Sequence, residues 1–189
     1  MVEHNKDILD LIHQCLVHNE SAQRRLFEIL APKIKKICMR YAGNEEDAKD
    51  DFQECIIQVF SNLTNYSKVR GEFFAWSYKI SRNTICARLR KQKVKWDELR
   101  NEDQSGMYDL PNVENHLHVE QILSYIQQMP IGYRTVFNLS VFEQCNHKKI
   151  SELLGITESS SRSQLSRAKV WLKEKIEESK QIAYEKAII

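Results

Sequence analysis

The sequence predicts an all-α protein, and three observations lead to this prediction. The chain of 189 residues contains only five glycines and three prolines, too few for the many turns of a β-rich protein. Apolar residues recur at helical spacing along almost its whole length. No stretch alternates β-branched with polar residues, as a half-buried strand would. We therefore expect two small helical domains joined by an acidic, flexible linker.

The composition is that of an ordinary globular chain. Hydrophobic residues make up 42% and charged residues 29% of the sequence. No apolar run approaches the roughly 20 residues of a membrane span, so we expect no membrane insertion. The N-terminus lacks the basic region and cleavage site of a signal peptide, which predicts a cytoplasmic protein. The five cysteines are odd in number, widely spaced and without a CxxC pair, which favours buried thiols over disulfides or a zinc site.

Three amphipathic helices are predicted before residue 64. The second is expected to bend or restart near Pro32. Asn44 is a good N-cap for the third, and acidic residues follow it in the first turn. The apolar faces of the three helices are expected to consist of Ile8, Ile12, Cys15 and Leu16; of Leu26, Leu30, Ile34, Ile37 and Tyr41; and of Ala48, Phe52, Ile56, Val59 and Leu63.

The third helix also carries a polar stripe opposite its apolar face. This stripe contains Asp50, Gln53 and Glu54. A polar stripe of this kind suits a reversible protein interface, although a solvated acidic face has the same pattern.

A turn over residues 64–72 precedes the segment FFAWSYKISRNT, which begins a further helix. Phe73, Trp76 and Ile80 lie at helical spacing, and we interpret them as core. Asn83 is a candidate for a base contact, because an amide both donates and accepts on a base edge. The basic side chains expected to hold phosphates nearby are Lys79, Arg82 and Arg88.

Charge is distributed unevenly, although the formal net charge is only +2. Basic residues dominate 82–95, acidic residues dominate 97–114, and basic residues return over 148–175. Two basic segments separated by an acidic one suggest two modules that face one polyanion.

The second domain is predicted to begin with two helices. Val119, Ile122, Leu123 and Ile126 form the apolar face of one, which ends at Met129–Pro130. The apolar face of the next contains Tyr133, Val136, Phe137 and Val141.

The stretch NHKKISELLGITESSSRSQLSRAKVWLKEK reads as two further helices joined by a tight turn. Asn146 suits an N-cap, Gly155 suits a left-handed helix end, and Thr157 can cap the second helix. In the second helix Leu165, Ala168, Leu172 and Ile176 share the inward face.

The opposite face of this second helix carries two arginines and two serines, Arg162, Ser163, Ser166 and Arg167. Arginine bridges a guanine edge or clamps a phosphate, and serine reaches backbone or base. The layout is that of a recognition helix in a major groove, with His147, Lys148 and Lys149 on the flanking DNA backbone. The competing interpretation is an ordinary solvated helix.

The stretch ISELLGITESSSRSQLSRAKVWLKEKI resembles region 4 of bacterial sigma factors, the promoter-recognition subunits of RNA polymerase. The similarity is to the extracytoplasmic-function (ECF) group, whose pattern GxPxGTVxSRxxRAR is matched at Gly155, Arg162, Ser163, Leu165, Arg167 and Ala168. The chain departs from the pattern at Thr157 and at Ser159–Ser161. Asp50, Gln53 and Glu54 match the DxxQE signature of region 2, and residues 73–83 resemble its FxxWLYxIARN segment. The resemblance covers about residues 19–95 and 120–178.

The resemblance implies a division of roles along the chain. Residues 1–95 would form a region 2 domain that binds core polymerase and the minus-ten element. Residues 96–118 would be the linker, 119–178 a region 4 domain for the minus-thirty-five element, and 179–189 a tail that packs or frays. Implied partners are the clamp coiled coil and flap of core RNA polymerase, promoter DNA and an anti-sigma factor. No cofactor or metal is implied.

Two other function classes were weighed. A stand-alone dimeric helix-turn-helix regulator would need a palindromic site, and it leaves the stripe of Asp50, Gln53 and Glu54 without a role. An enzyme acting on nucleic acid would need clustered carboxylates in a shaped site, whereas Asp47, Asp50 and Glu54 are interpreted as a solvated face. The sequence therefore favours a sigma factor that is not an enzyme.

Overall fold

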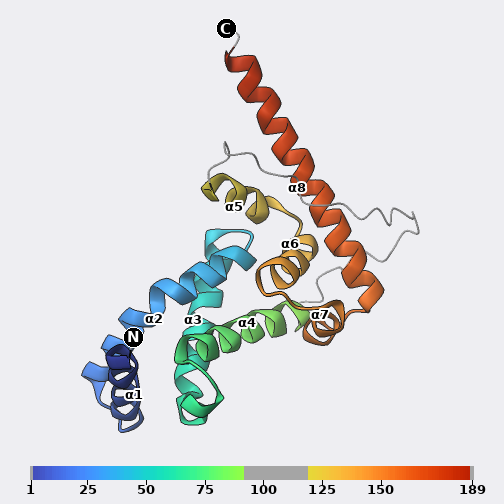
Figure 1. Ribbon diagram of the computed structural model, residues 1–189. Helices are drawn as coiled ribbons and strands as arrows, with labels where there is room; N and C mark the ends of the chain where they lie inside the picture. The colour runs from blue at the N-terminus through green and yellow to red at the C-terminus, as the bar shows by residue number, and fades with distance from the viewer. Residues whose placement is uncertain (1, 92–118, 188–189) are drawn as a thin grey trace. The chain divides into compact units, whose positions relative to one another are not determined.

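The computed structural model describes residues 2–91 and 119–187, with side chains over 7–91 and 121–181. Every element in these ranges is an α-helix, a 3-10 turn or a π turn, which confirms the all-α prediction there. The chain forms two compact units, Met1–Arg88 and Leu89–Ile189 (Figure 1). The expected linker 96–118 lies outside the described residues, as do the basic side chains of Lys93 and Lys95.

Unit 1 is built on a long second helix that packs against its neighbours on both sides. This helix, α2, contacts α1 and α3. The elements of unit 1 are α1 (Val2–Leu16), α2 (Glu20–Tyr41), α3 (Glu45–Ser61), the 3-10 turns η1 (Leu63–Asn65) and η2 (Lys68–Arg70), and α4 (Phe73–Lys91), whose last residues pass the boundary of the unit.

Asparagine side chains begin two of these helices. The Asn19 side chain accepts a hydrogen bond from the backbone N–H of Ala22 at 3.0 Å, at the start of α2. Asn44 accepts from the backbone N–H of Asp47 at 2.7 Å, at the start of α3. Each satisfies one of the free N–H groups of a first helical turn, and the prediction for Asn44 is confirmed.

The core of unit 1 forms where α1, α2, α3 and α4 meet. Its fully buried apolar side chains include Leu26, Leu30, Ile34, Cys38, Tyr41, Cys55, Val59, Phe73 and Ile85. The predicted restart at Pro32 is wrong, because α2 is one helix with Pro32 inside it, whereas a bend at this residue stays a prediction. Leu30 and Ile34 are buried on either side of the proline, and this packing offsets the lost backbone hydrogen bond.

The buried face of α3 differs from the predicted one. Ala48, Val59 and Leu63 are buried as expected, but Phe52 and Ile56 are only half-buried. The residues of α3 that are buried in their place are Cys55 and Asp51. The helix is rotated relative to the expected apolar stripe because Asp51 has a partner on another helix, described below.

Unit 2 packs several short helices against one long one. Its elements are α5 (Val119–Gln128), α6 (Ile131–Phe137), the π turn η3 (Asn138–Phe142), α7 (His147–Leu154) and α8 (Glu158–Ala187). Ile126, Met129 and Phe137 pack with three residues of α8, namely Ala168, Leu172 and Ile176. Buried Arg134 donates to the carbonyls of Gln127 and Met129, and it thereby satisfies the C-terminal end of α5.

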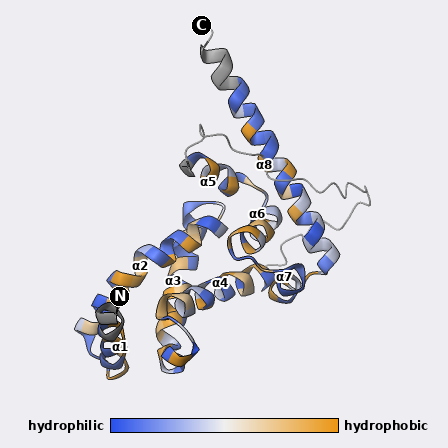
Figure 2. Ribbon diagram, in the orientation of Figure 1, coloured by the Kyte–Doolittle hydropathy of each residue, from blue (hydrophilic) through white to orange (hydrophobic). Residues whose placement is uncertain are grey.

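The last helix is longer than expected. The sequence assigned residues 179–189 to a tail that packs or frays, but α8 continues as one helix from Glu158 to Ala187. Figure 2 shows α8 as largely hydrophilic, with isolated hydrophobic positions along it. Residues 179–187 therefore continue α8 instead of forming a separate element.

Candidate nucleic-acid interface

A helix-turn-helix is formed by α7 and α8. The Asn146 side chain accepts from the backbone N–H of Lys149 at 2.8 Å, and this begins α7. Gly155 ends it in the left-handed conformation, with φ 68° and ψ 35°. Thr157 Oγ1 accepts from the backbone N–H of Ser160 at 3.1 Å, in the first turn of α8. All three predictions from the sequence are confirmed, and local side-chain chemistry thus sets the angle between the two helices.

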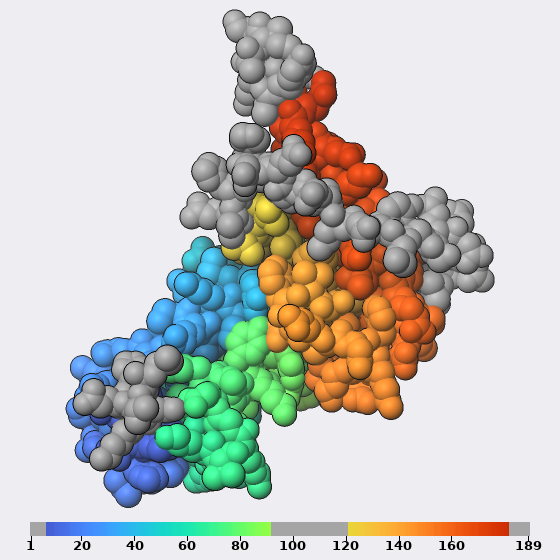
Figure 3. Space-filling view, in the orientation of Figure 1, coloured from blue at the N-terminus to red at the C-terminus, as the bar shows by residue number. Residues whose placement is uncertain are grey.

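The outward face of α8 is polar and accessible. Arg162 is exposed, and Ser163, Ser166 and Arg167 are half-buried. Arg162 Nη1 lies 3.3 Å from a carboxylate oxygen of Glu158 in a solvent-exposed ion pair. Such pairs contribute little and exchange partners readily, so the guanidinium remains available to a DNA anion. In the space-filling view α7 and the first turns of α8 form one continuous surface (Figure 3).

His147 connects the two helices of the motif. Its Nδ1 lies 2.9 Å from Oγ of Ser161, which is fully buried on the inward side of α8. Burial, and then the positive charge of Arg162, lower the pKa of His147 below its ordinary value. The imidazole is therefore favoured in its neutral form, which holds the start of α8 against α7.

Lys148 and Lys149 lie on the exposed side of α7, beside the helix-turn-helix surface. Both side chains are exposed, and Lys149 Nζ is 2.9 Å from a carboxylate oxygen of Glu152. The structure thus brings the basic residues expected at the flanking DNA backbone onto the same unit as the recognition face.

The polar stripe of α3 is exposed along its length. Asp50, Gln53 and Glu54 all face solvent, and Glu54 accepts from the Gln58 side chain at 2.9 Å. The side chain of Ile57, one turn further along, is 55% exposed. An exposed isoleucine among polar groups is the arrangement found at the centre of many protein interfaces, and the sequence analysis missed it.

The polar residues of α4 lie near one another. Lys79 and Asn83 are exposed and Arg82 is half-buried. Arg82 donates to the amide oxygen of Asn83 from Nε at 3.2 Å and from Nη2 at 3.0 Å. The guanidinium therefore orients the Asn83 amide and directs its NH2 group away from the arginine.

Arg88 differs from the sequence-based expectation. We expected it to hold a DNA phosphate, but its guanidinium binds Asp51 of α3, with Nε 2.5 Å from Oδ1 and Nη2 2.8 Å from Oδ2. The side chain of Asp51 is only 2% exposed. A bound cation stabilises a buried carboxylate, so Arg88 pairs with Asp51 in unit 1, and its assignment to a DNA phosphate stays a prediction.

Two further cations on α2 were missed by sequence reasoning. Lys33 Nζ lies 4.5 Å from the ring centroid of Phe74, and Arg40 Cζ lies 5.8 Å from that of Tyr78. Arg40 Nη2 also donates to the Tyr78 hydroxyl. No local signal reveals these contacts, because each joins residues about 40 positions apart.

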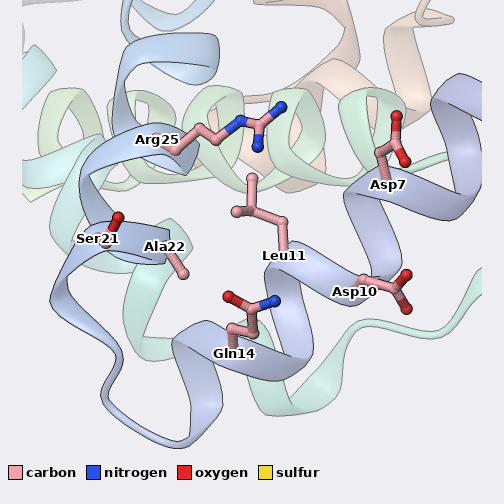
Figure 4. Close-up of a pocket in the computed structure, with 7 residues that line it drawn as sticks. All are labelled: Asp7, Asp10, Leu11, Gln14, Ser21, Ala22 and Arg25. Atoms are coloured by element: carbon pink, nitrogen blue, oxygen red, sulfur yellow. The ribbon is translucent and has the colours of Figure 1, made fainter.

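A pocket of about 260 Å³ lies between α1 and α2, away from all these residues. Figure 4 shows Arg25 and Leu11 extending into the space between the two helices. Its lining consists of Asp7, Asp10, Leu11, Gln14, Ser21, Ala22 and Arg25. None of the candidate interface residues is among those that line this pocket.

Within the described part of the chain, no three His, Cys, Asp or Glu side chains gather as a metal ion would require. His116 and His118, which flank Leu117 in the sequence as an HxH pair, lie outside that part. Among the described helices none is long and apolar enough to cross a bilayer.

Comparison with known proteins agrees with this geometry. Residues 26–94 match the family model "Sigma-70 region 2", and residues 119–172 match "Sigma-70, region 4". The first segment contains most of α2 and all of α3 and α4, and the second contains α5, α6, α7 and α8 as far as Leu172.

Individual relatives are similar over most of the chain. The ECF RNA polymerase sigma factor SigW of Bacillus subtilis (strain 168) is 25% identical over 177 residues, which cover 87% of this chain and 94% of SigW. RNA polymerase sigma factor SigZ of the same organism is 30% identical over 148 residues, 75% of this chain and 80% of SigZ. RNA polymerase sigma factor HrpL of Pseudomonas syringae pv. syringae is 22% identical over 179 residues, 92% of this chain and 97% of HrpL.

The chain belongs to the sigma-70 family of RNA polymerase sigma factors. Within that family it is an ECF sigma factor, which carries region 2 and region 4 and directs transcription initiation by RNA polymerase. The alternative of a stand-alone dimeric regulator is set aside, because a region 2 match over residues 26–94 has no place in it.

Proposed function

We propose that this sigma factor reads a promoter with two surfaces, one on each unit. The outward face of α8 would read the minus-thirty-five duplex, and α4 would hold the unpaired strand of the minus-ten element. The observation that carries the proposal is the helix-turn-helix itself, whose capped helices leave Arg162, Ser163, Ser166 and Arg167 on an accessible face. The proposed domains remain 1–95 and 119–178, joined by the linker 96–118.

Binding of the minus-thirty-five element would place the N-terminal turns of α8 in the major groove. Arg162 and Arg167 are suited to guanine edges, and the two serines to bases or phosphates. Lys148 and Lys149 would hold the flanking phosphates, since both ammonium groups are exposed on the neighbouring helix. His147 would set the position of α8 through Ser161 and lie beside that backbone.

Binding of the minus-ten element would use the polar end of α4. Asn83 can pair with a base edge through its amide, which Arg82 orients. Lys79 and Arg82 would neutralise phosphates on either side of that base.

Binding to core polymerase would use the exposed stripe of α3. Asp50, Gln53 and Glu54 would face the clamp coiled coil, with Ile57 as an apolar contact. Unit 2 would reach the flap. An anti-sigma factor that covers the α3 stripe would keep the chain inactive. In this scheme the chain acts in the cytoplasm without a cofactor, and it catalyses no reaction itself because the polymerase supplies the chemistry.

The proposal is tested by initiation in vitro. The purified chain is mixed with core RNA polymerase that lacks its own sigma factor, on a fragmented genomic template, and transcript starts are sequenced. Starts that share two spaced upstream elements are expected. Failure to bind core, combined with tight DNA binding by a dimer of the chain alone, would overturn the proposal.

Base reading by α8 is tested on the promoter so identified. Arg167→Ala is expected to cost about 1–3 kcal/mol of binding and to relax specificity at one base pair. Lys148→Ala should weaken binding equally on every sequence and lower the salt slope by about one. Lys173→Ala is the control, because Lys173 is exposed on the same helix two turns beyond the recognition face. Equal weakening on all sequences by Arg167→Ala would show that it only holds phosphate.

A further inference from the structure

Helices α1 and α2 enclose a pocket that contains none of the residues proposed to bind DNA or polymerase. It has a volume of about 260 Å³ and lies within unit 1. The lining residues from α1 follow a spacing of three and four positions, so they share one face of that helix; they are Asp7, Asp10, Leu11 and Gln14. Those from α2 lie in its first two turns; they are Ser21, Ala22 and Arg25.

The two walls of this pocket carry opposite charges. Asp7 and Asp10 place two carboxylates on the α1 side, one turn apart. Arg25 extends from α2 into the space between the helices (Figure 4). Ser21 lies in the first turn of α2, where the free backbone N–H groups give the helix end a partial positive charge. The pocket thus has an anionic wall and a cationic wall.

The charged groups of both walls are available to a ligand. Asp7, Asp10 and Arg25 are exposed, and their side chains form no ion pair or hydrogen bond with any residue that the structure describes. Between the charged groups lie Leu11, which is 8% exposed, and Ala22, which is 3% exposed. The pocket therefore combines unpaired charges of both signs with an apolar floor.

We propose that this pocket binds a small zwitterion, a molecule with an ammonium group and a carboxylate joined by a short apolar chain. The ammonium group binds the carboxylates of Asp7 and Asp10, and the ligand carboxylate binds the guanidinium of Arg25. The carbon chain between them lies on Leu11 and Ala22. This site is independent of the proposed promoter contacts, so the failure of either proposal leaves the other standing.

Both the charge pattern and the size of the pocket favour this class of ligand. A simple anion bound to Arg25 would lie close to the carboxylates of α1, and a simple cation bound to those carboxylates would lie close to Arg25. A zwitterion places each of its charges against the opposite charge. The volume of about 260 Å³ is below the roughly 300–1,000 Å³ of sites for drug-sized molecules, which indicates a ligand of amino-acid or dipeptide size.

The test is a titration of the full chain with three probes of equal carbon number, followed by proton–nitrogen correlation NMR. γ-Aminobutyrate carries both charges, whereas butyrate lacks the ammonium group and butylamine lacks the carboxylate. γ-Aminobutyrate is expected to shift the amide signals of Leu11 and Ala22 saturably, with a dissociation constant on the order of 1 mM. The other two probes should each bind about 3–10-fold more weakly, because each lacks one charged contact.

Two variants assign each charge of the ligand to one wall. Arg25→Gln should weaken binding of γ-aminobutyrate and butyrate by about 3–10-fold without weakening that of butylamine. The double variant Asp7→Asn, Asp10→Asn should weaken binding of γ-aminobutyrate and butylamine without weakening that of butyrate. Arg24→Gln is the matched control, since Arg24 is exposed next to Arg25 and does not line the pocket. It should change the affinity for γ-aminobutyrate by less than about 1.5-fold, because that probe has no net charge.

Hydrogen exchange of the full chain provides a second measurement. A ligand that bridges α1 and α2 stabilises the state in which the two helices are packed together, so local opening of α1 becomes rarer. At a γ-aminobutyrate concentration ten times the dissociation constant, exchange of α1 peptides should slow about tenfold, while exchange of α8 peptides should not change.

Several results would overturn the proposal. They are the absence of saturable shifts up to about 50 mM γ-aminobutyrate, equal affinities for all three probes, or unchanged exchange of α1 peptides at saturation. An equal loss with Arg24→Gln and Arg25→Gln, or a loss with Arg25→Gln that is the same for butyrate and butylamine, would also overturn it. The comparison of the three probes on the unmodified chain decides the question even where a variant fails to fold.

Discussion

Replacing Arg88 by alanine is expected to destabilise unit 1 strongly, because it leaves the buried carboxylate of Asp51 without its cation. The two side chains make two hydrogen bonds, and their exposed fractions are 26% for Arg88 and 2% for Asp51. Removing one partner of a buried ion pair costs about 3–5 kcal/mol. The carboxylate can avoid this cost if it is protonated. Protonating a carboxyl group with an ordinary pKa near 3.9 costs about 4 kcal/mol at pH 7, and this value is an upper limit on the loss.

The expected loss for Arg88→Ala is therefore about 2–4 kcal/mol, a large part of the roughly 5–15 kcal/mol that holds a typical domain folded. Burial raises the pKa of Asp51, while the hydrogen bond and charge of Arg88 lower it. Without Arg88 that pKa rises further. A carboxyl group whose pKa is higher in the folded state than in the unfolded state destabilises the fold at pH values where the unfolded state is ionised. The loss of unfolding free energy caused by Arg88→Ala is therefore largest at high pH and becomes smaller as the pH falls.

Urea unfolding of the full chain at pH 8 and pH 5, followed by circular dichroism, measures this deficit. Hydrogen exchange of peptides from α3 and α4 localises it to unit 1. Lys91→Ala is the control, because it removes one charge from an exposed position of the same helix. Adding Asp51→Asn to Arg88→Ala should recover part of the loss, since the amide carries no charge. A loss below about 1 kcal/mol, or one that does not change with pH, would refute the reasoning.

Four further predictions concern other parts of the chain. His147→Asn can keep an amide near the Ser161 hydroxyl and should therefore retain binding to the minus-thirty-five element. His147→Gln should lose the hydrogen bond to Ser161, and its affinity in a mobility-shift assay should fall by about 5-fold. Because the folded-state pKa of His147 is lowered, its protonation opposes folding, so unit 2 should lose stability below about pH 6.5 in urea titrations, and His147→Asn should remove that loss. Gly155→Ala should cost about 1 kcal/mol in thermal unfolding, since its φ of 68° is left-handed; an unchanged midpoint would contradict this. In the native chain Cys145 should react first with a thiol reagent: a hydrogen bond to Cys38 and burial raise the pKa of Cys55, and burial raises that of Cys15. Equal rates for all five thiols would contradict it.

Features set by neighbouring residues could be predicted from the sequence. The caps at Asn44, Asn146 and Thr157 need only a side chain and an N–H group three residues away. The left-handed end at Gly155 likewise follows from local backbone freedom. The helix-turn-helix and its outward face were therefore predictable in detail.

Features set by distant residues could not be predicted in this way. The sequence assigned Asp51 to neither the apolar face nor the solvated face of its helix, and only its contact with Arg88, 37 residues away, places it in the core. The same contact holds Arg88, which was expected to bind a DNA phosphate. The pairing of Arg40 with Tyr78 spans 38 residues, so no periodicity within α2 indicated that it belongs to the α4 surface. Helical spacing identifies which residues share a face but not what that face meets.

The uninterrupted course of α8 has a mechanical consequence. A helix of 30 residues is about 45 Å long, and nothing in α8 from Glu158 to Ala187 introduces a hinge. Its two ends therefore move as one lever. A tilt of about 5° about the Glu158 end displaces the other end by about 4 Å. A load or a fluorescent probe attached near the far end would thus register, in amplified form, small changes in the orientation of the first turns of α8.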